Sequence, residues 1–268
     1  PPAYRRMSSI MVSKSQKRGI AYDLSSVNDL KAISAGISWY YNWGASPHSS
    51  LSFSLSAVHG VDYIPMLWNE NFHEASVLRF FRENPGIKYM LVLNEPTIGL
   101  QAYTEPQRAA ELWPRFENIA RQVGVSIVGP QVTWGTMPDY QAPADWLDAF
   151  IAAYITNNGK PPQIDFLGFH WYDYGLEDQL NLLARFGKPF WVTEFANAHS
   201  RQDGAQIDSL EKQKAQMSEM VALCERREDV FRYAWFTGRV NPDPHFQRLF
   251  EGDGELSALG QHYISLPH

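Results

Sequence analysis

Two glutamates, each at the end of a short apolar run, are the residues whose types and positions could most directly do chemistry. Glu95 lies in the segment LVLNEP at residues 91–96, and Glu194 lies in FWVTEF at residues 190–195. Both segments are rich in the residues typical of β-strands. In α/β barrels, side chains at the carboxyl ends of strands line the reactive rim. Two such carboxyl groups could act as general acid and nucleophile, the minimum needed to cleave a glycosidic bond.

Eight β-type runs alternate with segments long enough to hold a helix. The predicted strands cover residues 19–24, 36–43, 61–68, 88–95, 125–132, 164–172, 190–195 and 230–238. Apolar residues at helical spacing predict helices over residues 106–123, 144–157, 176–186, 207–227 and 257–266. The crossovers at 25–35 and 45–60 carry only weak helical patterns. Strands that alternate with helices pair in parallel, so we predict a (β/α)8 TIM barrel, with an open doubly wound sheet as the alternative.

Length and composition fit one catalytic domain. The 268 residues match the roughly 250 that such a barrel needs, so we assign residues 19–268 to a single barrel and residues 1–18 to a basic N-terminal extension. That extension lacks the apolar centre of a signal peptide. A net charge of −6 without a long basic run argues against nucleic acid as a partner. No run approaches the roughly 18 apolar residues of a membrane span, and the single Cys224 excludes an internal disulfide.

Five motifs in this order resemble one family of barrel glycosidases. They are GIAY at 19–22, SWYYNW at 38–43, LNEP at 93–96, GFHWY at 168–172 and WVTEF at 191–195. Together they look like the glycosyl hydrolase catalytic core of glycoside hydrolase family 128, the group similar to a fungal alkali-sensitive linkage protein. The resemblance implies endo-acting hydrolysis of β-1,3-glucan with retention, without a metal or another cofactor. It also implies that Glu95 is the acid/base, that Glu194 is the nucleophile and that Asn94 binds the sugar 2-hydroxyl.

Aromatic residues near strand ends are candidates for binding sugar, because sugar rings stack on indole faces. Nine tryptophans are many for this length; Trp113 and Trp146 lie on helix stripes and are predicted to be core. Tyr172 ends the strand beside that of Glu194 and is predicted to orient its carboxylate. His170 is predicted to touch substrate or the acid/base, with a core histidine as the alternative. The full set of predicted substrate-binding residues is Asn94, Trp39, Asn42, Trp43, Trp68, Asn69, Trp134, His170, Tyr172 and Trp235.

Two other functions remain open on the sequence alone. The same machinery could act on another β-glycan, such as a β-1,4-glucan or a mannan, or the barrel could bind β-glucan without turnover. The sequence contains no H-E-x-x-H motif, which would indicate a catalytic metal, and no G-x-S-x-G motif, which would indicate a serine hydrolase. We expect a secreted protein, because a polymeric substrate cannot enter cells, and we also expect a monomer. Residues 97–103, which follow no family motif, are expected to shape the substrate subsites.

Overall fold

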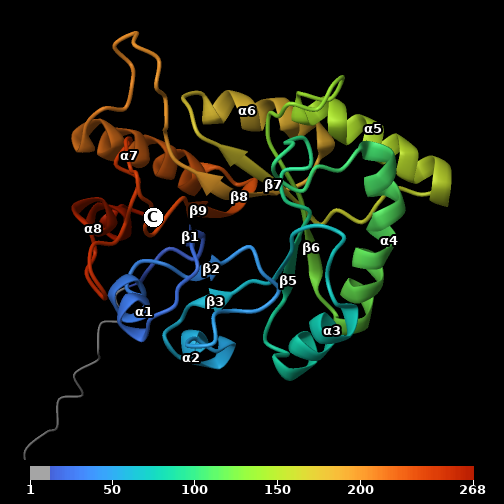
Figure 1. Cartoon of the computed structure of the whole chain (residues 1–268), viewed down its shortest axis with the longest axis horizontal. Coiled ribbons are helices and arrows are strands. Elements are labelled where there is room, and N and C mark those ends of the chain that lie inside the picture. The colour runs from blue at the N-terminus through green and yellow to red at the C-terminus, as the bar shows by residue number, and fades with distance from the viewer. Residues whose placement is uncertain (1–12) are drawn as a thin grey trace, which may run out of the picture.

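The computed structural model describes residues 13–268, and its strands form one parallel sheet surrounded by helices (Figure 1). The strand order is β3-β2-β1-β9-β8-β7-β6-β5-β4. The strands are β1 (Arg18–Ala21), β2 (Trp39–Tyr41), β3 (Asp62–Tyr63), β4 (Met66–Leu67), β5 (Tyr89–Val92), β6 (Ser126–Val132), β7 (Phe166–Trp171), β8 (Phe190–Phe195) and β9 (Val230–Trp235).

The sheet closes into a ring because β3 and β4 are halves of one extended segment. β3 pairs with β2, and β4 pairs with β5. Between the halves, the Ile64 N–H donates to the Tyr40 carbonyl at 3.0 Å, and the Pro65 carbonyl accepts from Leu91 at 2.9 Å. Proline has no N–H for a ladder, which explains the break at residue 65. The result is an eight-stranded barrel, so the predicted (β/α)8 fold is confirmed and the open sheet is excluded.

Helices fill the crossovers and lie outside the strands (Figure 1). They are α1 (Val27–Ile33), α2 (Phe53–Val58), α3 (Glu74–Glu83), α4 (Pro106–Val123), α5 (Pro143–Asn158), α6 (Leu176–Leu183) with the 3-10 turn η1 (Ala184–Phe186), α7 (Leu210–Arg226) and α8 (Ala258–Ser265). α1 and α2 have only seven and six residues, in agreement with their weak patterns. Prolines occupy the first positions of α4 and α5, where a missing N–H costs nothing.

Apolar side chains form a core on each side of the strands. Between strands and helices, Trp113 and Trp146 are fully buried, as predicted. Inside the ring, Trp39 and Trp191 pack edge to face with ring centres 5.0 Å apart. Cys224 is also fully buried, and burial raises the pKa of its thiol to about 12, so it is an inert core residue.

The N-terminal end of the described chain packs on the barrel. Lys17 donates to the carbonyls at 224, 225 and 227, and the Arg18 guanidinium is buried against the carbonyls of Tyr263 and Leu266. Lys17 and Arg18 therefore pack on the barrel, while residues 1–12 of the predicted extension lie outside the described residues. Within residues 13–268, no helix is both long enough and apolar enough to cross a membrane.

Candidate active site

The two glutamates meet at one buried point on either side of a histidine. Glu95 follows β5, Glu194 lies in β8, and His170 lies in β7 between them in the ring. His170 Nδ1 is 3.0 Å from Glu95 Oε2 and 3.3 Å from Glu194 Oε2. One atom from each of the three side chains lies within 4.8 Å of the other two. The predicted convergence of the carboxyl groups is confirmed.

An unusual backbone brings Glu95 to this point. Leu93 and Glu95 have φ values of 57° and 49°, in the left-handed region that residues other than glycine rarely adopt. The strand β6 holds this turn, because the Glu95 N–H donates to the Gln131 carbonyl and the Gln131 N–H donates to the Leu93 carbonyl, both at 2.9 Å. Such strain persists where neighbouring structure over-determines it, and it is typical of active sites.

A β-bulge in β8 places two consecutive side chains on the same histidine. Phe169 pairs with Val192 and His170 pairs with Glu194, so Thr193 is an extra residue in the ladder. Regular alternation would send residues 193 and 194 to opposite faces. With the bulge, Thr193 Oγ1 lies 2.8 Å from His170 Nε2 while Glu194 lies near Nδ1.

Three aromatic side chains hold Glu194, whose side chain is only 8% exposed. The Tyr172 hydroxyl donates to Oε1, and the Trp43 indole N–H donates to Oε2 at 3.0 Å. The Tyr41 hydroxyl lies 3.5 Å from Oε2 and donates to the Thr193 carbonyl at 2.8 Å. The contact predicted between Tyr172 and Glu194 is confirmed, and these donors fix the carboxylate in one orientation.

Burial and nearby charges shift the ionisation of this cluster. Burial raises the pKa of Glu194; the His170 cation lowers it, the charge of Glu95 raises it, and the net direction is upward. For His170, burial lowers the pKa, but the charges of Glu194 and Glu95 raise it further, and the net direction is again upward. The site therefore favours keeping a proton among these three groups.

Asn94 precedes Glu95 and is almost fully buried, with 1% exposure. Its Nδ2 donates to Gln101 Oε1 at 3.1 Å. Among residues 13–268, its Oδ1 has no hydrogen-bond partner. Buried polar atoms are normally paired, so an oxygen without a partner is unusual beside Glu95. Gln101 lies in the segment 97–103 that matched no motif, and it braces Asn94.

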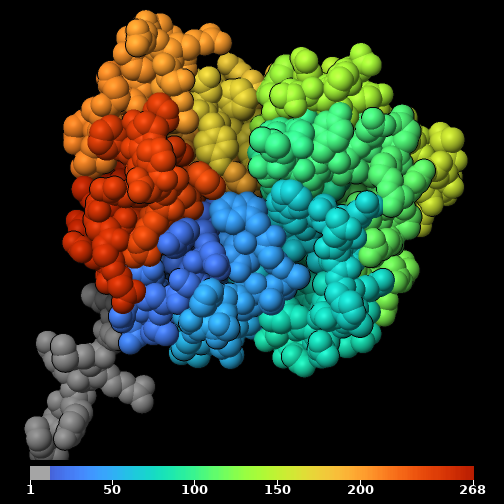
Figure 2. Space-filling view, in the orientation of Figure 1, coloured from blue at the N-terminus to red at the C-terminus, as the bar shows by residue number. Residues whose placement is uncertain are grey.

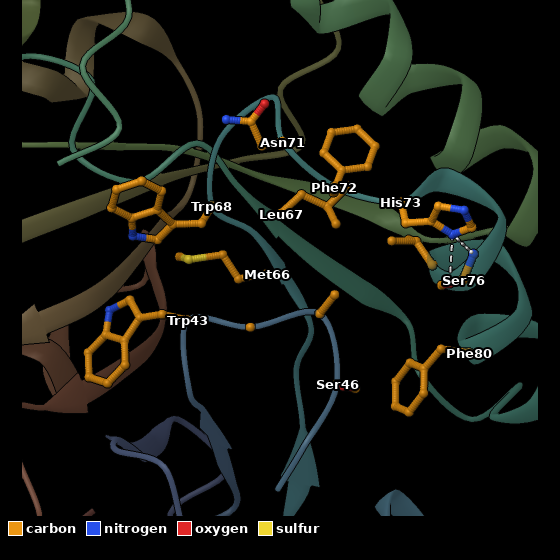
Figure 3. Close-up of a pocket in the computed structure, with 13 residues that line it drawn as sticks. Trp43, Ser46, Met66, Leu67, Trp68, Asn71, Phe72, His73, Ser76 and Phe80 are labelled. Atoms are coloured by element: carbon orange, nitrogen blue, oxygen red, sulfur yellow. Dashed lines mark hydrogen bonds between the residues drawn. The ribbon is translucent and has the colours of Figure 1, made fainter.

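Half-buried tryptophans line a cavity of about 320 Å3 beside Glu194. Trp43 and Trp68 lie at one end of it around Met66, and Phe72 lies toward the other (Figure 3). Trp43 connects this cavity to the glutamate pair, because its indole N–H also bonds Glu194. The structure therefore brings the predicted residues Trp43 and Trp68 to the site.

Two more predicted residues lie farther along the rim. Asn69 lines a second cavity of about 470 Å3 together with Gln101 and Tyr103. Trp134 is 47% exposed and donates its indole N–H to Gln179 at 2.8 Å. Contact of either residue with substrate stays a prediction.

Two predicted substrate contacts do not fit the structure. Trp39 and Trp235 are fully buried: the first packs inside the ring, and the second packs against Phe195 in the outer layer. The prediction is wrong for both, because the end of an apolar run does not reveal depth in the barrel. Asn42 is half-buried; it accepts from the Tyr63 hydroxyl and donates to Asp23, and its contact with substrate stays a prediction.

Sequence reasoning missed Tyr41, Thr193 and Gln131, which complete the hydrogen bonds of the cluster. One signal was visible: Gln131 is a polar residue in the otherwise apolar end of β6. Thr193 could not be found, because its orientation depends on the bulge.

The barrel and its paired carboxylates define a glycosidase active site. Within the described chain, the cluster of Glu95, His170 and Glu194 is also the one set of His, Cys, Asp and Glu side chains close enough to share a metal ion. The side chains of these three residues also form hydrogen bonds with one another or with neighbouring residues.

Comparisons with known proteins agree with this class. A family model described as glycosyl hydrolase catalytic core matches residues 19–263. A GH128 subgroup II endo-β-1,3-glucanase from Pseudomonas viridiflava is 56% identical with a TM-score of 0.94, covering 96% of this chain and 100% of that one. A second, from Sorangium cellulosum, is 34% identical with a TM-score of 0.81, covering 94% and 98%. The chain therefore belongs to glycoside hydrolase family 128, as the motifs predicted.

A curated relative is longer. Alkali-sensitive linkage protein 1 of Schizosaccharomyces pombe is 28% identical over 269 residues, which cover 94% of this chain and 45% of that protein. The chain thus spans less than half the length of this curated relative.

Proposed function

We propose that the protein is an endo-β-1,3-glucanase that retains anomeric configuration. The observation that carries the mechanism is the separation of the carboxylates: an oxygen of Glu95 and an oxygen of Glu194 lie within 4.8 Å. Retaining glycosidases place the two carboxyl groups about 5–5.5 Å apart, whereas inverting enzymes leave about 6.5–9.5 Å for a water molecule. The spacing therefore supports double displacement.

In the first step, Glu194 attacks the anomeric carbon while Glu95 protonates the departing glycosidic oxygen. The donors Tyr172 and Trp43 hold Glu194 in place, so little reorganisation is needed for the attack. In the second step, Glu95 removes a proton from water, and the water hydrolyses the glycosyl ester. Two inversions at the same carbon give net retention.

The proposed substrate is supported by the relatives and by the site. The Pseudomonas viridiflava and Sorangium cellulosum proteins carry the endo-β-1,3-glucanase activity in their names. Trp43 and Trp68 offer indole faces to sugar rings next to the nucleophile. The unpaired oxygen of Asn94 is suited to accept a hydroxyl of the sugar at the cleavage point.

The decisive experiment is hydrolysis of laminarin by Glu194→Gln. We expect kcat to fall at least about 10^3-fold, because glutamine cannot form the glycosyl ester, while the fold is retained. The exposed Glu83→Gln is the matched control and should keep wild-type turnover. Azide should rescue Glu194→Ala and give an α-linked glycosyl azide. Wild-type turnover by Glu194→Gln, or a β-linked azide, would contradict the proposal.

Substrate choice is tested with a panel of laminarin, curdlan, cellulose and mannan. We expect preference for the β-1,3-linked polymers. A preference for cellulose or mannan would contradict the proposed substrate but would not affect the proposed mechanism. A purely binding role is disfavoured by the burial of two adjacent carboxylates, which binding alone does not require. We also propose that the protein is secreted, since the polymer cannot enter cells. We propose separately that it acts as a monomer.

A further inference from the structure

A directional chain of hydrogen bonds connects the barrel wall to the catalytic pair. Gln131 Nε2 donates to the main-chain carbonyl of Val128 at 2.7 Å and to that of Val92 at 3.4 Å. Gln131 Oε1 accepts from Thr193 Oγ1 at 2.8 Å. Thr193 Oγ1 in turn lies 2.8 Å from His170 Nε2. All three side chains are fully buried.

The direction of every bond in this chain follows from its first member. Main-chain carbonyls can only accept, so they fix the amide of Gln131 with its NH2 toward them and its oxygen toward Thr193. Thr193 has a single hydroxyl proton, and it donates that proton to Gln131. Its oxygen can therefore only accept from His170, and Nε2 must carry a hydrogen in every protonation state.

The space for this chain is built into the neighbouring strand. A side chain at Gly168 in β7 would overlap the amide of Gln131, since a Cβ there meets its oxygen and carbon. The main chain of Gln131 also holds the turn at Glu95. One residue of β6 thus contacts the acid/base through its backbone and the histidine network through its side chain.

We propose that Gln131 and Thr193 are positioning residues that hold the Nε2–H of His170, which makes Nδ1 the atom that exchanges a proton with Glu95. This inference rests on the proposed function of Glu95 as acid/base. In the exchange, the Nδ1–H bond of the cation breaks as an O–H bond forms at Glu95 Oε2, 3.0 Å away, and the reverse step restores it. Charge and atoms balance within the pair, without an outside reactant.

The fixed Nε2–H favours retention of the proton that His170 and Glu95 share. A neutral His170 presents only a lone pair at Nδ1, which can accept from a protonated Glu95 but would repel two carboxylates. Losing the shared proton is therefore unfavourable, and it occurs only at higher pH. The other titratable groups that face the cluster are Tyr41 and Tyr172, and burial raises the pKa of both well above the ordinary value, so they stay protonated.

The test compares Thr193→Val with Thr193→Ser. Valine keeps the shape but removes the hydroxyl, so neutral His170 can move its hydrogen to Nδ1 and stabilise ionised Glu95. We expect the alkaline limb of kcat/KM on laminarin to move to lower pH by about one unit, the size of one buried hydrogen bond that changes partner. Serine keeps the hydroxyl and should restore the wild-type limb.

Gln131→Met is the second variant, because Thr193 then loses its acceptor and can donate to Nε2. It should shift the limb in the same direction as Thr193→Val, and it keeps the test usable if that variant does not fold. A lower kcat with an unmoved alkaline limb in both variants would overturn the inference. So would a Thr193→Ser limb that moves as far as that of Thr193→Val.

Imidazole 15N shifts read the tautomer directly in the absence of substrate, with His170→Gln to identify the resonance. The neutral form should carry its hydrogen on Nε2 in the wild type and on Nδ1 in Thr193→Val; the same tautomer in both would refute the inference. Failure of the wild type to cleave laminarin would refute the proposed function, but it would leave the tautomer result standing, so the two failures are distinguishable.

Discussion

At the scale of residues, the active site keeps ionisable groups out of water at a cost to stability. Glu194 is 6% exposed, and its largest influence is burial, which disfavours the charged form and raises its pKa. Hydrogen bonds from Tyr172 and Trp43 offset part of this effect. These bonds thus orient the carboxylate but only partly offset the cost of burying its charge, as is common where function and stability compete.

Glu194→Gln should therefore stabilise the fold at high pH. A carboxyl group with a raised pKa in the folded state contributes stability that is present at low pH and is lost as pH rises through that pKa. The neutral glutamine avoids this loss. We expect the midpoint of thermal unfolding to exceed that of the wild type by about 2–4 °C at pH 8 and to converge with it near pH 4.

Calorimetry at both pH values measures this difference, and the exposed Glu83→Gln should show none. The same ionisation should set the acid limb of kcat/KM, because protonated Glu194 cannot attack. If the unfolding midpoint of Glu194→Gln lay below that of the wild type at pH 8, the expectation would be contradicted. The hydrogen bonds to the Glu194 carboxylate would then stabilise the fold by more than the burial of its charge costs.

At the scale of elements, the loop after β5 is locked to the loop after β6. Thr97 Oγ1 donates to the Thr133 carbonyl at 3.0 Å, and the Thr97 carbonyl accepts from the amides of Thr136 and Met137. The contact is close at Gly135, where a Cβ would overlap the side chain and the carbonyl oxygen of Thr97. The position of Glu95 therefore depends on a glycine in the neighbouring loop.

Gly135→Ala should separate the two loops and displace the acid/base. We expect kcat/KM on laminarin to fall about 10^2-fold, the size of effect that follows a displacement of roughly 1 Å at a catalytic group, with little change in the unfolding midpoint. Gly99→Ala, in the facing loop after β5, is the matched control, since a Cβ there would have Thr136 Oγ1 as its nearest neighbour, 4.0 Å away. Equal losses in both variants would contradict a specific role of Gly135, because they would show that neither loop tolerates a substituted glycine.

Much of the element layout was predictable because periodicity reports burial on one face. The helix α4 has the predicted bounds of 106–123, and β8 has those of 190–195. The bulge at Thr193 and the left-handed turn at Glu95 were not predictable. Both are local departures from regular geometry that neighbouring strands impose, so no pattern within one strand encodes them.

Candidate residues were predictable in proportion to how specific their chemistry is. A single glutamate at a strand end is more often a salt-bridge partner or a helix cap, but Glu95 and Glu194 were found because they form a pair that coincides with the family motifs. Tryptophans were not separable in this way: Trp43 donates to Glu194, whereas Trp39, four residues earlier, is core. An indole serves equally well against sugar or against side chains, so only depth in the barrel distinguishes them.

At the scale of the whole molecule, the barrel must join its first and last units. Segments from both ends of the chain lie side by side on one face (Figure 2). Arg239, after β9, binds Asp29 of α1 through two bonds of 2.6 and 3.0 Å, and it also donates to the carbonyls of Glu251 and Gly252. The Asp29 side chain is 2% exposed, and its partnership raises the pKa of Arg239.

Arg239→Met should weaken the contact between the first and last units of the barrel, because the buried Asp29 would lose its positively charged partner. We expect the free energy of unfolding, from urea titration, to fall by about 2 kcal/mol, less than for a fully buried pair because Arg239 is one-third exposed. Turnover of laminarin by the folded protein should not change. Arg108→Met, at an exposed ion pair, should leave the free energy of unfolding nearly unchanged, because water and salt screen exposed charges. Adding Asp29→Asn should recover part of the loss; equal losses for Arg239→Met and Arg108→Met would mean that the barrel closes through apolar contacts alone.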